Sequence, residues 1–241
     1  MAGANPEMNS VWLRRRRSRD QPALSREQIV SEAVRLLDTE GLDALSMRRL
    51  GTRLDAGATS LYRHVANRDE LIELVVDQVY GEIDVLEARR KAEWRSAAVA
   101  CARSTRTMIL RHPWVATLLG QVGLAHLGPN VIRLNDRMLA VFEKAGFEPV
   151  EADQALGTLM AYVIGMGVSE AAWLTTVARS EHDEQAWARR LEPLVREAAE
   201  QYPRLLVQAE LAEPRDPQQA RDVHFDYGME RVLDGLAGRL D

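Results

Sequence analysis

The sequence lacks the features that mark secreted and membrane proteins. Its 241 residues include a single cysteine, Cys101, which cannot form a disulfide within the chain and therefore fits a reducing, cytoplasmic compartment. It has no run of eighteen apolar residues and no signal-peptide pattern, and its longest uncharged stretch, residues 154–169, is too short for a bilayer. We therefore expect neither a membrane-spanning segment nor a membrane partner.

Signatures of catalysis are also missing. The sequence has no glycine-rich phosphate loop, no His/Cys cluster with metal-ligand spacing and no nucleophile-elbow pattern. The run His182-Asp183-Glu184 is better explained as a solvated loop that leads into a helix. An all-helical enzyme stays an alternative without a positive signal, and we expect no catalytic residue, no cofactor and no metal site.

Strand patterns are absent, so the expected fold class is all-α. No stretch alternates convincingly between apolar and polar residues, and 46% apolar composition is ample for a buried core. Ser25 and Gln28 form a capping box, Asn67 begins the fourth helix in the same way, and Pro113 ends another. We expect helices over residues 25–40, 46–54, 58–64, from 67 onward, 91–111, 129–145, 150–176, 184–211 with interruptions near Pro193 and Pro203, and 223–239, with a loop at 214–222.

Residues 46–70, SMRRLGTRLDAGATSLYRHVANRDE, are the most informative part of the chain. They predict two short helices joined by a tight turn, in which Ser46 caps the first helix and Gly57 takes the positive φ that the turn needs. Leu61 and Val65 are four residues apart and are expected to point inward. The second helix then turns a polar face outward, made of Thr59, Ser60, Tyr62, Arg63 and His64.

This pattern is that of a helix-turn-helix whose second helix lies in the major groove of double-stranded DNA. Hydroxyl, phenol, guanidinium and imidazole groups suit phosphate oxygens and base edges. We expect base or groove-edge contacts from Arg48 and Arg63. Phosphate contacts are expected from the other polar residues, namely Thr59, Ser60, Tyr62, His64 and Arg68. On spacing alone, an ordinary helical hairpin with a solvated outer face remains an alternative.

The string LYRHVANRDEL, residues 61–71, resembles the motif that closes the DNA-reading helix in the TetR/AcrR family of bacterial regulators. Residues 24–51, LSREQIVSEAVRLLDTEGLDALSMRRLG, are similar to the family's first helix and the start of its second. HPW (112–114), GPN (128–130) and FDYGMERVLDGLA (225–237) resemble the branch with a C-terminal domain of the tetracycline-repressor type. The resemblance implies a bacterial regulator with a three-helix helix-turn-helix head and a larger helical domain for effector binding and dimerisation.

The net charge of −5 is unevenly distributed along the chain, with +2 in residues 1–70 and −7 in the remainder. The sign changes where the motif places the domain boundary. Residues 14–19, RRRRSR, are predicted to be disordered, and they either contact phosphates or a minor groove or act as a solubilising tail. The expected division is a basic arm over 1–23, a helix-turn-helix domain over 24–70 and a ligand-binding and dimerisation domain over 71–241.

Two helices of the second domain are candidates for a homodimer interface. The last helix carries an apolar stripe, and the helix at 150–176 is apolar on nearly all sides and needs covering on more than one face. The resemblance implies that they pair with their twins, which would also give the symmetric half-sites that one short reading helix needs. The alternative is two core helices of a monomer. The expected interface residues are Gly157, Gly165, Phe225, Met229, Val232, Leu233 and Leu236.

The resemblance also implies a small-molecule effector inside the second domain. Candidates are polar or soft residues on otherwise apolar helices, namely Met108, His112, Trp114, Met138, Tyr162, Met166, Ser169 and Trp173. The last four sit at helical spacing and could line one wall, whereas His112 ends a helix beside a proline. Each can instead be an ordinary core residue. The side chains that grip magnesium-bound tetracycline in tetracycline repressors have no clear match here, so tetracycline is not the expected ligand.

The function that these patterns favour is a ligand-responsive DNA-binding transcriptional regulator. We expect a repressor that a small-molecule effector releases from a palindromic operator by moving its two reading heads away from the spacing of roughly 34–36 Å between successive major grooves. An architectural DNA-binding protein without effector control is the alternative, although a second domain of this length is large for that task.

Overall fold

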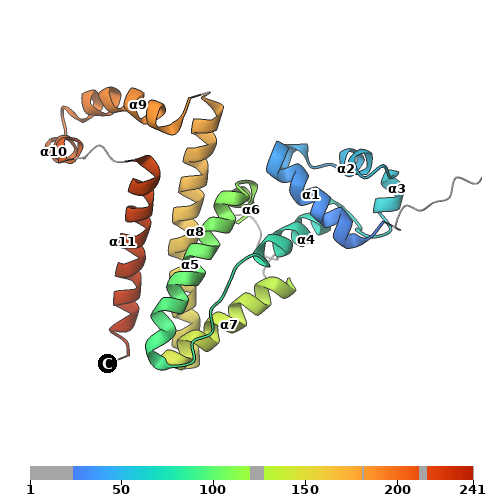
Figure 1. The fold of residues 1–241 in the computed structure, drawn as a ribbon, viewed down its shortest axis with the longest axis horizontal. Coiled ribbons are helices and arrows are strands. Elements are labelled where there is room, and N and C mark those ends of the chain that lie inside the picture. The colour runs from blue at the N-terminus through green and yellow to red at the C-terminus, as the bar shows by residue number, and fades with distance from the viewer. Residues whose placement is uncertain (1–23, 120–127, 181, 212–215, 241) are drawn as a thin grey trace, which may run out of the picture.

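The computed structural model describes residues 24–119, 128–180, 182–211 and 216–240. The predicted basic arm, with its arginine run at 14–19, lies outside the described residues. Every regular element within the described ranges is a helix or a short 3-10 turn, which confirms the all-α prediction (Figure 1).

Among the described residues, four helices form the amino-terminal part of the fold and seven form the rest. The first group comprises α1 (Arg26–Glu40), α2 (Met47–Arg53), α3 (Ala58–Leu61) and α4 (Arg68–Tyr80), with a 3-10 turn at Leu42–Ala44. The second group opens with a 3-10 turn at Lys91–Glu93 and comprises α5 (Trp94–Arg111), α6 (Trp114–Leu119), α7 (Pro129–Ala145), α8 (Pro149–Arg179), α9 (Glu184–Ala199), α10 (Pro203–Leu211) and α11 (Pro217–Ala237).

The head, α1 to α3, is a small helical unit built around fully buried leucines. Leu36, Leu50 and Leu61, one from each helix, have no exposed surface. The predicted capping box at the start of α1 is present, with the Ser25 hydroxyl accepting from the Gln28 backbone and the Gln28 side chain accepting in return. Such caps satisfy the free N–H groups of a helix end and fix where it begins.

The helix α4 connects the head to the rest of the molecule. Asn67 caps it as predicted, by accepting from the backbone N–H of Glu70 at 2.8 Å. One side of α4 packs on α1 and another on α7, and Figure 1 shows it between the two parts of the fold. Any change in the tilt of α4 would therefore move the head.

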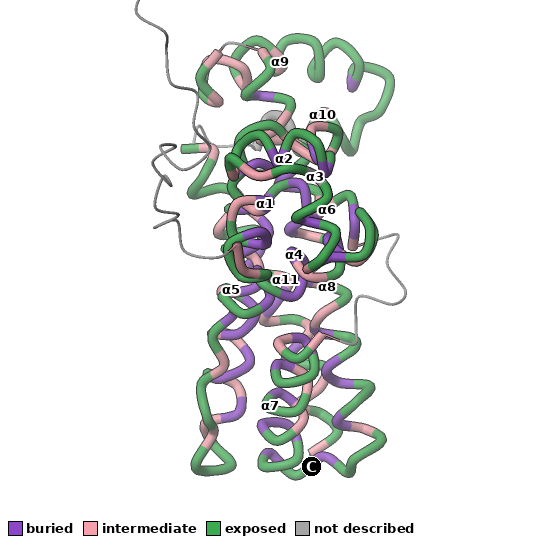
Figure 2. Tube along the Cα trace, turned by 90° about the vertical axis from the view of Figure 1, so that its right-hand side faces the viewer, coloured by how far each residue is buried: buried purple, intermediate pink, exposed green. Residues whose placement is uncertain are grey.

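The second domain is a bundle around α8, against which α5, α6, α7 and α11 pack. Figure 2 shows buried positions recurring along one side of α5 and α7, as expected for helices that cover a central one. At one end of the bundle, Trp94, Phe142 and Phe147 form an aromatic cluster with ring centroids 5.6–6.0 Å apart. Tilted and edge-on contacts of this kind stabilise the packing of α5 on α7 beyond their buried area.

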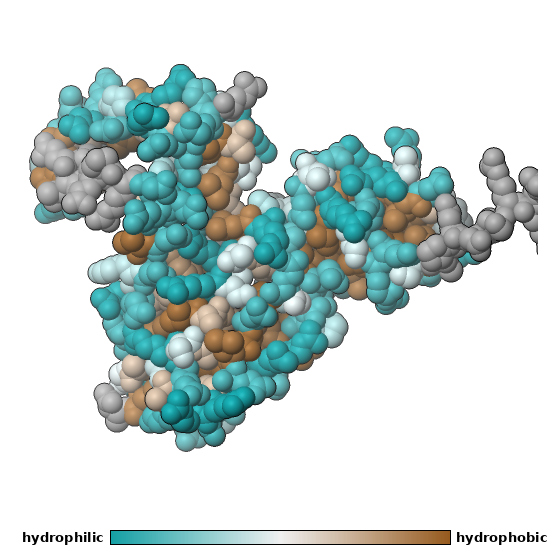
Figure 3. Space-filling model, viewed as in Figure 1, coloured by the Kyte–Doolittle hydropathy of each residue, from teal (hydrophilic) through white to brown (hydrophobic). Residues whose placement is uncertain are grey.

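The helices α9 and α10 project from the end of the bundle (Figure 1). They pack on each other, while α9 also contacts α8 and α11. The face of this projection seen in Figure 3 is largely hydrophilic, yet the two helices and their connection also expose five large apolar side chains, Leu194, Val195, Tyr202, Leu205 and Val207.

The turn between α2 and α3 differs from the prediction. Asp55, not Gly57, has the positive φ, at 49°. The backbone N–H of Ala56 donates to Gly51 at 2.9 Å and that of Asp55 donates to Thr52 at 3.3 Å. These two bonds define a Schellman C-cap, which places the left-handed residue directly after the cap residue Leu54. Aspartate tolerates that conformation, so the glycine two positions later is not needed for it.

Two prolines also differ from the prediction, Pro193 and Pro217, whereas the predicted interruption near Pro203 is confirmed. Pro193 lies inside α9, where its exposed position lets water bond the carbonyl that the proline leaves free. The break comes before Pro203, which opens α10. The last helix begins at Pro217 inside the expected loop, because Asp216 caps it and proline is favoured in the first turn.

Candidate nucleic-acid interface

The helix α3 presents polar side chains outward over a fully buried seam. Leu61 and Val65 are 0% and 1% exposed, which confirms that they point inward. Thr59, Ser60 and Arg63 are exposed, as is the ring of Tyr62 at 52%. The α-helix proper ends at Leu61, and a further turn carries the chain to His64, whose N–H donates to Leu61. The side chains of Thr59, Ser60, Tyr62 and Arg63 are therefore accessible from solvent.

Among the arginines of α2, Arg48 differs from its neighbours. Arg49 pairs with Glu40, and Arg53 pairs with Glu32 at 2.5 Å. Arg48 is exposed and makes no ion pair with any described residue. A guanidinium whose charge is not compensated locally is the one best placed to meet a phosphate or a guanine edge.

Two of the predicted phosphate contacts also hold the head together. Arg68 donates from Nε to the Leu45 carbonyl at 3.2 Å and from Nη2 to the Leu42 carbonyl at 3.4 Å. His64 is half-buried, and its carbonyl accepts from the Arg26 Nε at 3.2 Å. These bonds hold the segment after α3 against the start of α1 and against the segment before α2, so substitution of Arg68 would disturb the shape of the head as well as its charge.

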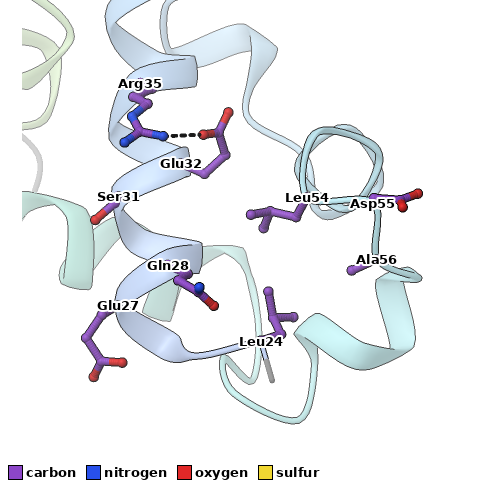
Figure 4. A pocket seen from close by; sticks show the side chains of 9 residues that line it. All are labelled: Leu24, Glu27, Gln28, Ser31, Glu32, Arg35, Leu54, Asp55 and Ala56. Carbon is purple, nitrogen blue, oxygen red and sulfur yellow. Dashed lines mark hydrogen bonds and ion pairs between the residues drawn. The ribbon is translucent and has the colours of Figure 1, made fainter. Parts of the chain in front are cut away.

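A groove of about 600 Å³ opens on the head between α1 and the turn after α2 (Figure 4). Its charged side chains are Glu27, Glu32, Arg35 and Asp55, and Arg35 pairs with Glu32 at 3.1 Å. Hydrogen bonds from its own backbone N–H and from the Ser25 hydroxyl hold the pKa of Glu27 below its ordinary value, which keeps that carboxylate charged. Because three of these four groups are acidic, the groove is unsuited to a phosphate backbone.

The residues predicted to line an effector pocket do not form one group. Met108 and Met138 are buried in the bundle core. Tyr162 and Met166 are half-buried and Ser169 is exposed, so the predicted wall on α8 turns partly outward. The Tyr162 hydroxyl donates to the Phe225 carbonyl at 2.8 Å.

His112 and Trp114 lie instead at the junction with the head. His112 is 3% exposed and its Nδ1 is 2.6 Å from the Asp38 Oδ1 of α1. The Trp114 Nε1 donates to the same oxygen at 2.7 Å. The structure thus brings these two predicted pocket residues together, but on a residue of the head.

A second cluster of charged groups lies where α5, α8, α9 and α11 meet. Glu170 accepts from Arg106 at 2.6 and 2.8 Å and from Arg221 at 2.8 Å. Burial works to raise the pKa of Glu170, but the hydrogen bonds from the two arginines outweigh it and lower the pKa. Trp173, the last of the predicted wall residues, donates to Glu184 of α9 at 2.6 Å beside this cluster. The cluster ties the base of the α9–α10 projection to the bundle.

The predicted interface residues separate into two sets. Phe225, Met229 and Leu233 are at most 1% exposed and pack inside their own chain, whereas Val232 and Leu236 are half-buried. Gly157 and Gly165 lie on the exposed side of α8, and a Cβ added at either would meet nothing within 4 Å. The apolar stripe of α11 therefore packs in the core of its own protomer. The glycines of α8 leave room for another helix to approach this one closely.

Sequence patterns gave no sign of the carboxylates that join the parts of the fold. Asp77 of α4 is 9% exposed and accepts from the backbone N–H groups of Asn130 at 2.9 Å and Val131 at 3.2 Å, so it caps α7 from another helix. The GPN string was a possible signal, because a Cβ at Gly128 would collide with Asp77. Asp38 and Glu170 carried none.

Comparisons with known proteins agree with this geometry. Residues 29–75 match the family model for bacterial regulatory proteins of the tetR family, and residues 88–240 match that for the tetracyclin repressor-like C-terminal domain. An HTH-type transcriptional regulator from Saccharopolyspora erythraea is 35% identical over 230 residues, which is 95% of this chain and 91% of the relative. The HTH-type transcriptional repressor DrrR1 from Streptomyces coeruleorubidus is 32% identical over 220 residues, which is 90% and 78% of the two chains.

Solved structures show the same fold. The crystal structure of the TetR family protein ActR from Streptomyces coelicolor in complex with actinorhodin superposes with a TM-score of 0.74 at 31% identity, covering 89% of this chain and 95% of ActR. Both family models together span most of the chain, and the relatives match nearly all of it. The chain belongs to the TetR family of DNA-binding transcriptional regulators and has a C-terminal domain of the tetracycline-repressor type.

Proposed function

We propose that the protein is a cytoplasmic, homodimeric repressor that binds a palindromic operator and leaves it when the second domain takes up a small-molecule effector. The outward face of α3 is the observation that carries the proposal. Its polar side chains stand over a seam whose apolar residues are fully buried, so they have no packing role within the head. The protein then acts by binding and not by catalysis.

Contact with the operator is divided between two helices of the head. Arg63 on the turn after α3 and Arg48 on α2 are exposed, and each can reach the O6 and N7 acceptors of a guanine with its planar guanidinium. The hydroxyls of Thr59 and Ser60 and the phenol of Tyr62 then contact phosphates, which fixes the position of the helix in the groove.

The exposed face of α8 supports a homodimer. An 18-residue window of this helix has the length and composition to cross a membrane, with a mean hydropathy of 1.3, yet only 33% of it is buried within the protomer. Core helices of soluble proteins meet the same criterion. Because most of this window is not buried within the protomer, we infer that a second protomer covers it. Between residues 155 and 175 of α8, the exposed positions are small side chains that form one stripe, Gly157, Thr158, Ala161, Gly165, Ser169 and Ala172. Two such faces could pack closely around a twofold axis.

Effector control is proposed for the second domain because ActR, which has the same fold, has been crystallised with actinorhodin and with (S)-DNPA. The residues we propose for its lining are Tyr162, Met166 and Trp173 on α8, which are half-buried, together with the buried methionines Met108 and Met138. Ser169 is exposed, and His112 and Trp114 contact the head. We therefore place these three residues at the edge of the proposed pocket.

The experiment compares binding to the DNA upstream of the protein's own gene with binding to random duplex of equal length at physiological salt. A preference of roughly a thousandfold or more, with two protomers per site, is expected for a specific dimeric regulator. Equal and steeply salt-dependent binding would leave this operator unsupported and require a genome-wide search for sites. Binding to neither duplex would refute the proposed head–DNA contact.

A matched pair of variants tests the role of α3. Arg63→Ala should lower discrimination between operator and random duplex by about 1–3 kcal/mol if Arg63 contacts a guanine with both nitrogens. Arg35→Ala removes the same charge from α1, where Arg35 is 71% exposed and borders the mainly acidic groove, and should leave discrimination unchanged. If Arg63→Ala lowers the affinity for both duplexes equally, Arg63 contacts only phosphate and does not contact a base.

A further inference from the structure

The junction between the head and the second domain is closed by a buried histidine between two carboxylates. His112, at the end of α5, is 2.6 Å from Asp38 of α1 through Nδ1 and 3.1 Å from Glu82 through Nε2. Glu82 lies just after α4, and its other oxygen pairs with Arg111 at 2.7 Å. One side chain of the second domain thus contacts both the first helix of the head and the segment that follows α4.

Trp114 adds a second donor on the same acceptor. Its indole N–H donates to the Asp38 Oδ1 at 2.7 Å, and its ring lies edge-on to that of His112 with the centroids 6.0 Å apart. Trp114 is 5% exposed. Asp38, Glu82, His112 and Trp114 together are called the clasp below.

The clasp places two carboxylates around one buried side chain. Each ring nitrogen of His112 lies within hydrogen-bond distance of a carboxylate, and Arg111 pairs with the second oxygen of Glu82. Because His112 is nearly fully buried, removing either carboxylate would leave one of its ring nitrogens without that partner, and an unpaired buried polar group costs free energy.

A second tie holds α4 at a different point. The Asp77 carboxylate accepts from the first backbone N–H groups of α7 and from the Asn130 side-chain amide at 2.9 Å. A body that is held at one point can still rotate about it, whereas two ties fix its angle. Asp77 and the clasp therefore hold α4 and the head at two separate points.

We propose that the clasp is the positioning device that holds the head at the angle required for operator binding, a proposal that rests on the proposed function. Asp38 is its only member on the head, so every bond of the clasp that crosses the junction ends on that carboxylate. Displacement of α6, which begins at Trp114, would withdraw one donor from Asp38 directly. The clasp thus gives the second domain a way to release the head without unfolding either part.

The test uses two substitutions that weaken the clasp and two matched controls within the second domain. Trp114→Phe removes the indole donor and keeps an aromatic ring, and Asp38→Asn removes the charge and keeps the shape. Trp94→Phe is the control for the first, because Trp94 is similarly buried but packs on Phe142 and Phe147. Asp226→Asn is the control for the second, because Asp226 pairs with Arg103 inside the domain.

The primary readout is the distance between the head and the second domain. Spin labels are placed on Asp43→Cys and Glu143→Cys, two exposed positions, in the full-length chain, and Cys101 stays unlabelled because it is fully buried. Labelled chains are diluted with unlabelled protein so that only distances within a protomer are measured. We expect the distance distribution to broaden in both clasp variants and to stay narrow in both controls.

The second readout is DNA affinity. Operator affinity should fall about tenfold in each clasp variant, with affinity for random duplex and the helical content unchanged, since a hydrogen bond to a charged group is lost without change to the reading face. Distributions as narrow as that of the unsubstituted protein would overturn the proposal, even if affinity fell. Broadened distributions in a protein that does not prefer its operator would support the clasp and refute the proposed function instead.

Discussion

The substitution Gly128→Ala tests how firmly α4 is held to α7. Gly128 precedes α7 with φ −65° and ψ 146°, a conformation that alanine adopts without strain. A Cβ there, however, would lie 2.7 Å from the Asp77 Cβ and closer still to its Cγ and Oδ1. The backbone conformation at residue 128 therefore does not disfavour alanine. The effect of the substitution comes from the contact between the added Cβ and Asp77.

The magnitude follows from what Asp77 would lose. Its carboxylate caps α7 through the backbone N–H groups of Asn130 and Val131, and loss of an aspartate cap costs about 0.5–2 kcal/mol. Asp77 is 9% exposed, so a carboxylate displaced from these donors without full hydration adds about 1–3 kcal/mol. We expect Gly128→Ala to lower the free energy of unfolding by about 2–4 kcal/mol.

The assay is urea unfolding followed by circular dichroism, with all variants at one protein concentration because dimerisation would couple to stability. Gly235→Ala is the matched control: Gly235 is an exposed glycine of α11 with nothing within 4 Å of its added Cβ, and alanine there should stabilise the helix by up to about 1 kcal/mol. In an Asp77→Ala background, Gly128→Ala should cost almost nothing. If Gly128→Ala lowers the free energy of unfolding as much in the Asp77→Ala background as in the wild type, or does not lower it in the wild type, the reasoning is refuted.

Three further outcomes are expected. Ala161→Glu, on the exposed face of α8, should give a monomer in analytical ultracentrifugation with unchanged helicity, and a stable dimer would contradict the proposed interface. Burial raises the pKa of Cys101 to about 11, so at pH 8 its thiol should react with iodoacetamide far more slowly in native protein than in urea; rapid native labelling would contradict the packing. Glu170 has a lowered pKa in the folded state, so it stabilises the fold above its ordinary value of 4.5 and loses that contribution as the pH falls through its folded value. The stability difference between wild type and Glu170→Gln should therefore be largest near neutral pH and shrink in acid, and a constant difference would show that packing alone is responsible.

The parts of this fold that the sequence predicted are those made by neighbours in the chain. Ser25 and Gln28 are three residues apart, and so are Asn67 and Glu70, so their caps can be recognised in a short window. Leu61 and Val65 lie one helical turn apart, and their burial followed from the same short-range periodicity. The polar face of α3 was predictable because it is what remains when those two point inward.

Errors arose where two local rules competed. A glycine after a helix and an aspartate after a helix can both adopt a left-handed conformation, and hydrogen-bond closure at Gly51 decided for Asp55. A proline ends one helix and begins the next with the same fixed φ, so Pro217 was assigned to a loop although Asp216 supplies a cap. In both cases the outcome depended on hydrogen bonds that composition does not show.

His112 illustrates a different limit. A histidine at a helix end beside a proline predicted a residue at the edge of an effector cavity, whereas the structure buries it between Asp38 and Glu82. Burial of such a group requires hydrogen-bond partners, but any carboxylate of suitable reach would satisfy the chemistry. Asp38 is 74 positions away and Glu82 is 30, separations at which a single sequence carries no pairing information. The ties that hold the head to the second domain are all of this long-range kind, as are Asp77 to Asn130 and Arg106 to Glu170. The proposed DNA-binding face is therefore predictable from one short motif, whereas the contacts that join the head to the second domain are pairs that only the folded chain brings together.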